Sequence, residues 1–316
     1  MIAVRSLLTA FVLIAAPLGA QAQGAPLPAH DVVPGAQPAD VDIITPHITD
    51  SDEIDLPYWR APFYKVWHLP HWTPIHIGKY AIDLSPTKHV VMLLVAALIC
   101  CIVLISAASA HKRHTHAIGR PTGFAAGIES MVLFIRNEVA IPNLGHHGER
   151  YVPFILTLFF FILFANLLGL IPYGSTATGN ISVTATLAIM TFIVVEIAGM
   201  RAQGLGYLNT IFYWNKDLPL IMRVPMFFIM TPVEIIGKFT KPFALAIRLF
   251  ANMTAGHIVV LALIGLIFLF RGPLSTAPFL MAVAIMMLEL FVACLQAFIF
   301  SLLASVFIGQ IREGAH

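Results

Sequence analysis

Long apolar stretches without formal charge recur along the chain and restrict its fold more than any other feature. One runs from Val90 to Ala110 and another from Val152 to Ile171. An α-helix needs about 20 apolar residues to cross a bilayer, and it satisfies its backbone hydrogen bonds internally. With 59% hydrophobic residues, 11% charged residues and a mean hydropathy of +0.86, the sequence predicts an all-α polytopic membrane protein.

These stretches predict a helical membrane domain over residues 88–312 with about five membrane helices. From Phe279 to Ile308 there is no Gly or Pro, and the one charge is Glu289. A helix over residues 276–311 would be about 54 Å long, against about 30 Å of hydrocarbon. Because tilt relieves such a mismatch, we expect the last two helices to be long, steeply tilted and folded into a hairpin. The expected spans are 90–110, 152–172, 181–200, 225–270 and 276–311.

Residues 1–22 have the layout of a cleavable secretory signal peptide. Arg5 precedes an apolar stretch from Leu7 to Ala16, and Ala20, Gln21 and Ala22 form a small-residue cleavage site. An uncleaved extra span is the weaker alternative, because the apolar core is too short for one. A mitochondrial transit peptide would be richer in Arg and Ser, so we predict a bacterial protein of the cell inner membrane.

Two segments of different composition precede the first span. Residues 23–57 are acidic, lack Lys and Arg and hold many Pro and Ala, which favours a disordered extracytoplasmic tail. Residues 58–87 gather Trp and Tyr, which suits a segment at the membrane–water boundary. The histidines of this segment are interpreted as solvated interface residues, with a metal site as the alternative; they are His68, His71 and His76.

Basic residues set the expected orientation of the spans. The first span ends in HKRHTHAIGR, residues 111–120, and Arg201, Lys216 and Arg223 follow the third span. The cytoplasmic flanks of membrane helices carry an excess of Lys and Arg. We therefore expect a periplasmic mature N-terminus and a cytoplasmic C-terminus.

The charge of Arg248 stands alone between Phe243 and Phe270. An arginine inside a membrane costs about 3 kcal/mol on insertion scales, and its side chain stays protonated. Asn252 follows four residues later, so on a helix its amide shares a face with the guanidinium. An arginine that snorkels to lipid headgroups is the alternative. It fits less well because apolar sequence continues far beyond Arg248.

Other polar residues within the expected spans are candidates for an ion pathway. Glu234 falls on the helix face of Arg248, and Gln296 lies seven residues after Glu289 on another shared face. A carboxyl inside a span is typical of a proton or ion pathway. A locally paired structural carboxyl is the alternative for Glu289. The secondary polar candidates are Asn166 and Glu196.

Three stretches of the sequence resemble a known family. They are PFALAIRLFANMTAGH around Arg248, NLLGLIP at residues 166–172 and LQAFIFSLLASVFIG at residues 295–309. In composition, order and spacing they are similar to the a subunit of rotary F-type ATP synthases. The resemblance covers roughly residues 75–312 and is specific at these three stretches.

The resemblance implies a proton-conducting stator subunit that is not catalytic by itself. Two aqueous half-channels would pass H+ to and from the carboxylates of a rotating c-ring, with Arg248 separating them. Proton flow would thereby be coupled to rotation and ATP synthesis, and Na+ is the alternative ion. The implied partners are the c-subunit ring, b-type peripheral stalk subunits, the catalytic head and membrane lipid, with no nucleic acid. The implied pathway residues are Arg248, Asn252, His257, Glu289, Gln296 and Glu234.

His257 and Glu289 are predicted to form a pair in the half-channel open to the outside. They stand at similar distances on either side of the break near Gly272, so an antiparallel hairpin gives them similar depth. The resemblance implies an acid at the first position and a histidine at the second in many bacterial relatives, whereas this chain has the reverse. An exchange that keeps both groups favours a paired site, because each group supplies what the other lacks.

Two other classes of protein fit the intramembrane charges less well. A secondary transporter would show two matching halves with broken helices, and the sequence has no such repeat. An intramembrane protease would carry a motif such as HExxH or GxSxG, and neither occurs. The sequence also lacks the GxxxxGK[ST] phosphate loop, so we predict no nucleotide site, no cofactor and no metal.

Cleavage of the signal peptide is testable by mass. We expect the purified protein to begin at or near Gln23, because Ala20 and Ala22 are the small residues that signal peptidase sites require. Intact-mass spectrometry of the protein from its native membrane measures this directly. A mature chain that retains Met1 would contradict the prediction.

Overall fold

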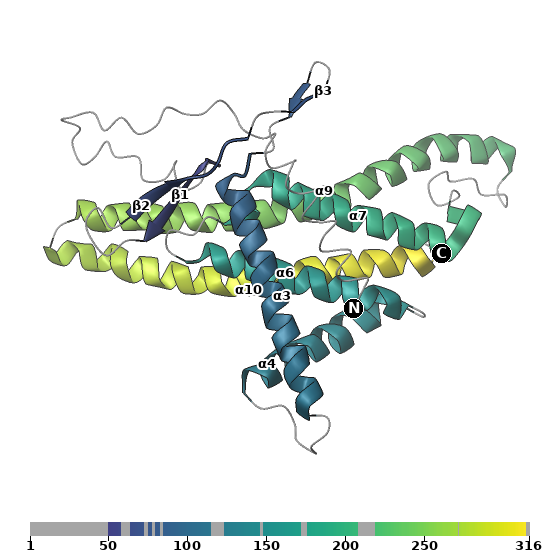
Figure 1. Cartoon of the computed structure of the whole chain (residues 1–316). Coiled ribbons are helices and arrows are strands. Elements are labelled where there is room, and N and C mark those ends of the chain that lie inside the picture. The colour runs from purple at the N-terminus through teal and green to yellow at the C-terminus, as the bar shows by residue number, and fades with distance from the viewer. Residues whose placement is uncertain are drawn as a thin grey trace. The chain divides into compact units, whose positions relative to one another are not determined.

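The computed structural model describes residues 50–57, 64–72, 75–77, 80–82, 85–114, 123–145, 148–171, 176–207, 219–270 and 272–313. Among these residues, five helices are long and apolar enough to cross a membrane (Figure 1). The predicted all-α polytopic fold is therefore confirmed. The predicted signal peptide, residues 1–22, and residues 23–49 lie outside the described residues. The five spans are Lys88–Ser109, Gly148–Gly169, Ile181–Gln203, Val224–Leu269 and Gly272–Arg312.

The helices follow the apolar stretches of the sequence closely. The α-helices are α3 (Lys88–His114), α4 (Phe124–Phe134), α5 (Ile141–Leu144), α6 (Val152–Gly169), α7 (Ile181–Gln203), α9 (Leu220–Leu269) and α10 (Thr276–Glu313). A π-helical turn, η2 (Ile135–Ala140), joins α4 to α5. The short 3-10 turns are η3 (Gly148–Tyr151), η4 (Ala177–Gly179), η5 (Gly204–Gly206) and η6 (Gly272–Ser275).

Helix α9 continues through three prolines, at Pro225, Pro232 and Pro242. Each proline removes one backbone donor and crowds the preceding turn. Such residues are tolerated in membrane helices because neighbouring groups satisfy the freed carbonyls. The helix therefore spans 50 residues, and α10 spans 38 without an internal break.

Two short antiparallel hairpins precede α3. Strand β1 (Glu53–Pro57) pairs with β2 (Tyr64–His68), with Glu53 opposite His68, and β3 (Ile75–Ile77) pairs with β4 (Tyr80–Ile82). The expectation that the disordered tail extends to residue 57 is therefore wrong for residues 53–57. The reason is local: Ile54 and Leu56 alternate with acidic residues, the two-residue period of a strand.

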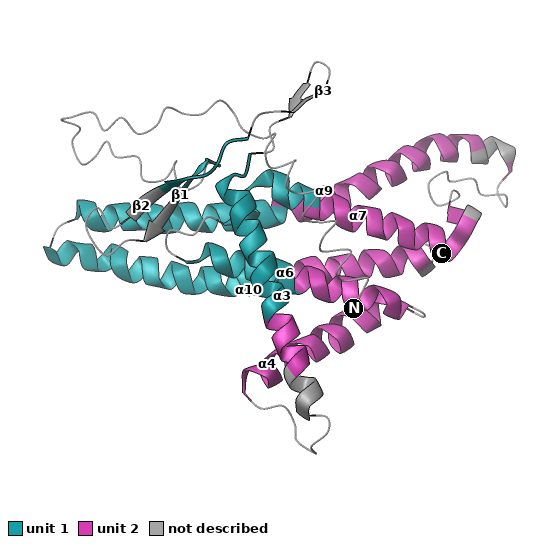
Figure 2. Cartoon of the chain, in the orientation of Figure 1, with its two compact units in different colours: residues 1–102, 160–186, 248–297 teal, residues 103–159, 187–247, 298–316 magenta. Residues whose placement is uncertain are grey.

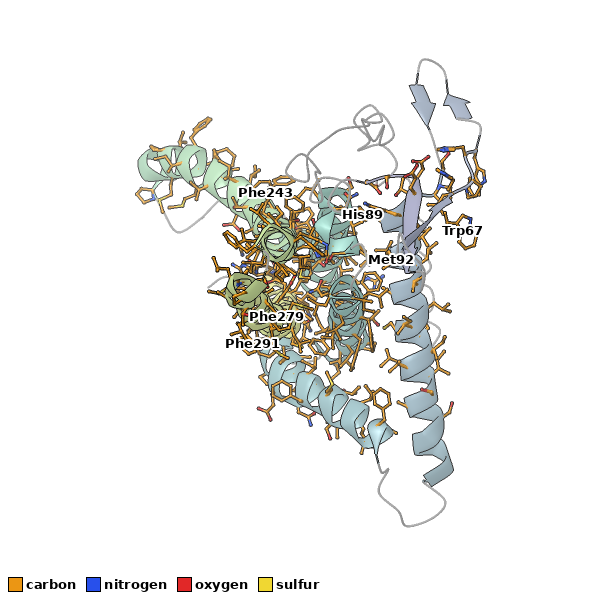
Figure 3. All side chains as sticks on the ribbon, turned by 90° about the vertical axis from the view of Figure 1, so that its left-hand side faces the viewer. Trp67, His89, Met92, Phe243, Phe279 and Phe291 are labelled. Atoms are coloured by element: carbon orange, nitrogen blue, oxygen red, sulfur yellow. The ribbon has the colours of Figure 1, made fainter. Side chains whose placement is uncertain are left out.

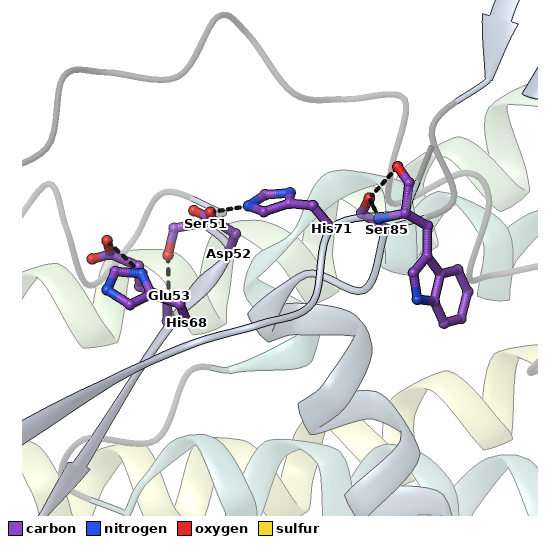
Figure 4. A network of polar contacts seen from close by, with 7 residues as sticks. Ser51, Asp52, Glu53, His68, His71 and Ser85 are labelled. Carbon is purple, nitrogen blue, oxygen red and sulfur yellow. Dashed lines mark hydrogen bonds and ion pairs between the residues drawn. The ribbon is translucent and has the colours of Figure 1, made fainter. Parts of the chain in front are cut away.

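Polar contacts hold this hairpin segment together (Figure 4), and a backbone hydrogen bond connects it to the start of α3. Nδ1 of His68 lies 3.3 Å from Glu53 Oε1, and Nε2 of His71 lies 2.6 Å from Asp52 Oδ2. The backbone N–H of Lys88 donates to the Ser51 carbonyl at 2.9 Å. Both histidine side chains are well exposed, as solvated interface residues should be. Within the described parts of the chain, no group of three or more His, Cys, Asp or Glu could hold a metal ion.

The chain divides into two compact units, shown separately in Figure 2. Unit 1 holds residues 1–102, 160–186 and 248–297, and unit 2 holds residues 103–159, 187–247 and 298–316. In unit 1, the second part of α9 and the first part of α10 lie side by side (Figure 1). On α9 the division falls between Ile247 and Arg248.

Helix α10 buries a stripe of mostly small side chains at spacings of three and four residues. In unit 1 the stripe includes Ala293 and Ala297, and in unit 2 it includes Ser301, Ala304 and Ser305, all fully buried. Small residues at this spacing let neighbouring helices approach closely. Phe291 lies on the opposite face of α10 and is exposed, as is Phe279 near the start of the helix (Figure 3), which suits contact with lipid or with another apolar surface.

Gly309 provides a test of this close packing in unit 2. A Cβ at this position would collide with the backbone carbonyl of Asn143, whereas a Cβ at Gly265 of α9 would meet nothing within 4 Å. We expect Gly309→Ala to destabilise the protein by about 1–3 kcal/mol through overpacking. Gly265→Ala, the matched control, should leave stability unchanged or raise it slightly. Thermal unfolding in detergent measures both; equal unfolding temperatures would contradict the packing.

Candidate functional site

A hydrogen bond between two amides joins α9 to α10 in unit 1. Nδ2 of Asn252 donates to Oε1 of Gln296 at 3.1 Å. Gln296 is 2% exposed, and its own Nε2 is buried without a hydrogen-bond partner among the described residues. A buried donor without a partner costs free energy. This amide is therefore ready to donate to a water or to another group that enters the site.

The carboxyl of Glu289 lies nearby on α10 and packs against a glycine of α9. A Cβ on Gly256 would stand only 2.9 Å from Oε1 of Glu289, so the glycine makes room for the carboxyl group. Glu289 is 6% exposed, and its Oε1 has no hydrogen-bond partner in the described part of the structure. The interpretation of Glu289 as a locally paired structural carboxyl therefore loses support.

His257 directly follows Gly256 on α9 and is half-buried. Because the carboxyl of Glu289 packs against Gly256, it lies beside the turn of α9 that carries the histidine. The similar membrane depth of His257 and Glu289 stays a prediction. Seven residues separate Glu289 from Gln296 on α10, and both are buried.

Arg248 lies on the exposed side of α9. Asn252, one turn further, is exposed as well, whereas Leu249 and Met253 are fully buried on the other side of the helix. The shared face expected for Arg248 and Asn252 is therefore present. A permanent charge on the outside of an apolar helix is available to another chain rather than to the interior of this one.

Asn166 is a structural link between three elements of unit 1. Its Nδ2 donates to the Ala293 carbonyl of α10 at 3.3 Å, and its Oδ1 accepts from the Thr178 hydroxyl of η4 at 2.7 Å. Thr254 of α9 contributes a hydroxyl that donates to the Gly179 carbonyl at 3.4 Å. These bonds satisfy polar groups that hydrocarbon cannot satisfy.

Unit 2 contains a separate polar cluster around Glu196 of α7. The Tyr207 hydroxyl donates to Glu196 Oε2, and Nζ of Lys238 on α9 donates to the same hydroxyl at 2.6 Å. Lys238 Nζ also lies 3.5 Å from Glu196 Oε1. Burial raises the pKa of Tyr207, and so do its hydrogen bond to Glu196 and the charges of Glu196 and Glu234. Glu234 itself is exposed on α9.

Comparison with known proteins identifies the family. The family model described as the ATP synthase A chain matches residues 89–309. The chain belongs to the ATP synthase A chain family. The matched region covers the five spans except for Lys88 and the last residues of α10, and it includes the buried polar residues of α9 and α10.

Individual members of this family align with the chain over most of their own length. ATP synthase subunit a 2 of Chlorobaculum tepidum is 45% identical over 273 residues, covering 85% of this chain and 72% of the relative. ATP synthase subunit a of Chloroherpeton thalassium is 47% identical over 269 residues, covering 84% and 74%. ATP synthase subunit a of Myxococcus xanthus is 45% identical over 273 residues, covering 83% and 86%.

Several residues that contact the predicted site residues were not identified from the sequence. Thr178 and Thr254 contact the site of unit 1, and Tyr207 and Lys238 contact Glu196. Tyr207 lies outside any recognisable motif, across the η5 turn from α7. Lys238 stands four residues after Glu234, a helical spacing that places both on one face. That spacing is the sequence feature from which Lys238 could have been predicted. No sequence feature indicated Tyr207.

Proposed function

We propose that this chain is the proton-conducting stator subunit of a bacterial ATP synthase. Two aqueous half-channels would carry H+ to and from the carboxylates of a c-subunit ring, and Arg248 would separate them. The proposal is carried by one observation: buried Glu289 and Gln296 lie in the α9–α10 hairpin of unit 1, which also presents Arg248 on its exposed side.

Arg248 would act through its permanent charge. As a ring carboxylate passes, the guanidinium stabilises the ionised form by about 4 kcal/mol at 4 Å for an effective dielectric constant near 20. The same charge repels protons and so prevents a direct leak from one half-channel to the other. Because the side chain does not lose its proton, this barrier persists throughout the cycle.

The distribution of polar groups supports two half-channels. One group, with Glu289 and Gln296, belongs to unit 1, and the other, with Glu196 and Glu234, belongs to unit 2. Along α9 the division between the two units falls between Ile247 and Arg248. We infer that the group in unit 1 serves the half-channel open to the outside and that the group in unit 2 serves the cytoplasmic one.

The partners and location follow from this role. The exposed face of Arg248 would meet the c-ring, and b-type peripheral stalk subunits and the catalytic head would complete the complex. The basic flanks after the first and third spans support a cytoplasmic C-terminus and a periplasmic mature N-terminus in the inner membrane. Nucleotide chemistry would belong to the catalytic head.

Removal of the charge at Arg248 tests the proposed function. Arg248→Ala should abolish ATP-driven proton pumping and permit a passive proton leak, because the barrier between the half-channels is lost. Arg248→Lys should fail too, since an ammonium lacks the planar fork and the permanent charge. Fluorescence quenching in inverted vesicles measures pumping, and immunoblotting confirms assembly. Normal coupled pumping by either variant would refute the role.

The pairing of His257 with Glu289 has its own test. His257→Ala and Glu289→Ala should each slow pumping strongly, because a proton relay loses one of its two groups. The exchange variant His257→Glu with Glu289→His should recover part of the rate if the two groups act together. Pumping rates of all four proteins, normalised to ATP hydrolysis, decide this. An exchange variant no faster than the slower single variant, together with single effects that simply add, would show that the residues are not a functional pair.

A further inference from the structure

We propose that Glu196 is a proton-exchanging carboxylate of the cytoplasmic half-channel, held in place by Tyr207 and Lys238. The inference rests on the proposed function and extends it to a cluster that the family resemblance does not include. In this scheme Glu196 captures protons from the cytoplasm and delivers them toward Glu234. Tyr207 and Lys238 are positioning residues.

The two carboxylate oxygens of Glu196 have different hydrogen-bond partners. Oε2 accepts the hydrogen bond of the Tyr207 hydroxyl, and that hydroxyl in turn accepts from Lys238 Nζ at 2.6 Å. Oε1 lies 3.5 Å from the same ammonium, a distance for charge attraction rather than for a good hydrogen bond. Oε1 is therefore the oxygen that is free to take a proton.

The cluster is largely but not completely buried. The side chain of Lys238 is 11% exposed and that of Glu196 is 19% exposed. The ring of Tyr207 supports the ammonium of Lys238, which lies 4.3 Å from the ring centroid. In the proposed half-channel, water reaches Glu196 through this exposed part, while the three side chains hold one another in position.

An ion pair in this position is poor evidence for stability alone. The desolvation of two charges often exceeds their mutual attraction, and well-packed apolar residues in the same place are frequently neutral or stabilising. The surrounding sequence is strongly apolar, so such residues would have been compatible with both helices. The retained pair is better explained by proton exchange, which needs a carboxylate and a nearby compensating charge.

The other charged groups around the cluster have defined positions. Glu234 is one turn before Lys238 on α9, and its charge acts on Tyr207. Lys241, one turn after Lys238, directs its ammonium over the ring of Phe307 of α10, 5.1 Å from the centroid. Arg201 is exposed near the end of α7. Glu234 is therefore the neighbouring carboxylate that can exchange protons with Glu196 through water.

The proton step is balanced within the cluster. A hydronium ion gives its proton to Oε1 of Glu196, which forms a neutral carboxylic acid and leaves water. Loss of the same proton to water that leads to Glu234 restores the carboxylate. Lys238 keeps its proton throughout, and its charge offsets the carboxylate whenever Glu196 is ionised.

The test measures ATP-driven pumping by the whole complex in inverted vesicles, where the cytoplasmic face meets the medium. The medium is varied between about pH 6 and 9, and pumping is normalised to ATP hydrolysis. Glu196→Gln should weaken proton capture most where protons are scarce, so the alkaline limb of the profile should move to lower pH. Lys238→Gln should move this limb to higher pH, because the positive charge that favours the ionised carboxylate is lost.

If Glu196 exchanges protons, Glu196→Gln and Lys238→Gln shift the alkaline limb of the pumping profile in opposite directions. Tyr207→Phe removes one hydrogen bond to the ionised carboxylate and should produce a smaller shift in the direction of Lys238→Gln. Glu149→Gln, the same carboxylate-to-amide change at an exposed position of η3 in unit 2, is the matched control and should leave the profile unchanged.

A purely structural role would give a different result. It would lower the amount of assembled complex while the normalised profiles of all variants superimpose, and that result would overturn the proposal. If a single variant fails to assemble, the double variant Glu196→Gln with Lys238→Gln leaves no uncompensated buried charge and should show the profile of Glu196→Gln. Arg248→Ala separates the two proposals: if it is uncoupled while Glu196→Gln behaves as wild type, this inference alone fails.

Discussion

The hydrocarbon core of a membrane supplies no hydrogen bonds, and the rest of this structure depends on that constraint. Each polar side chain within a span must find its partner inside the chain or serve a function there. Asn166 and Asn252 find theirs on α10, at the Ala293 carbonyl and at Gln296. Glu289 keeps one buried oxygen without such a partner in the described residues. Such a group is available to the proposed pathway, whereas Asn166 and Asn252 hold the helices together.

Small residues make this arrangement possible. Gly256 leaves space for the carboxyl of Glu289, and Ala293 and Ala297 bring α10 close to its neighbours in unit 1. In unit 2 the same function falls to Ala304, Ser305 and Gly309. Helices in a membrane associate through close packing rather than through the hydrophobic effect. The carboxyl of Glu289 consequently occupies the space that Gly256 leaves on α9.

Much of the architecture could be predicted from the sequence. The number and order of the spans follow from apolar stretches of sufficient length, and the family follows from the residues around Arg248, Asn166 and Gln296. The strand at residues 53–57 was missed, because an acidic, proline-rich composition outweighed a short two-residue alternation. Composition averages over a segment, whereas a strand depends on the pattern of a few residues.

The sequence by itself determined the local features of this protein. These are the lengths of the helices, their charges and the face that Arg248 and Asn252 share, because each depends on residues within a few turns of one another. Contacts across the fold were decided by tertiary structure. Glu196 meets Lys238 and Asn252 meets Gln296 across tens of residues, and Tyr207 reaches Glu196 from beyond a turn. Helical periodicity gives the direction of each side chain around its own axis. Helical periodicity does not tell which neighbouring helix the side chain meets, because the choice of neighbour depends on how small residues let the helices pack.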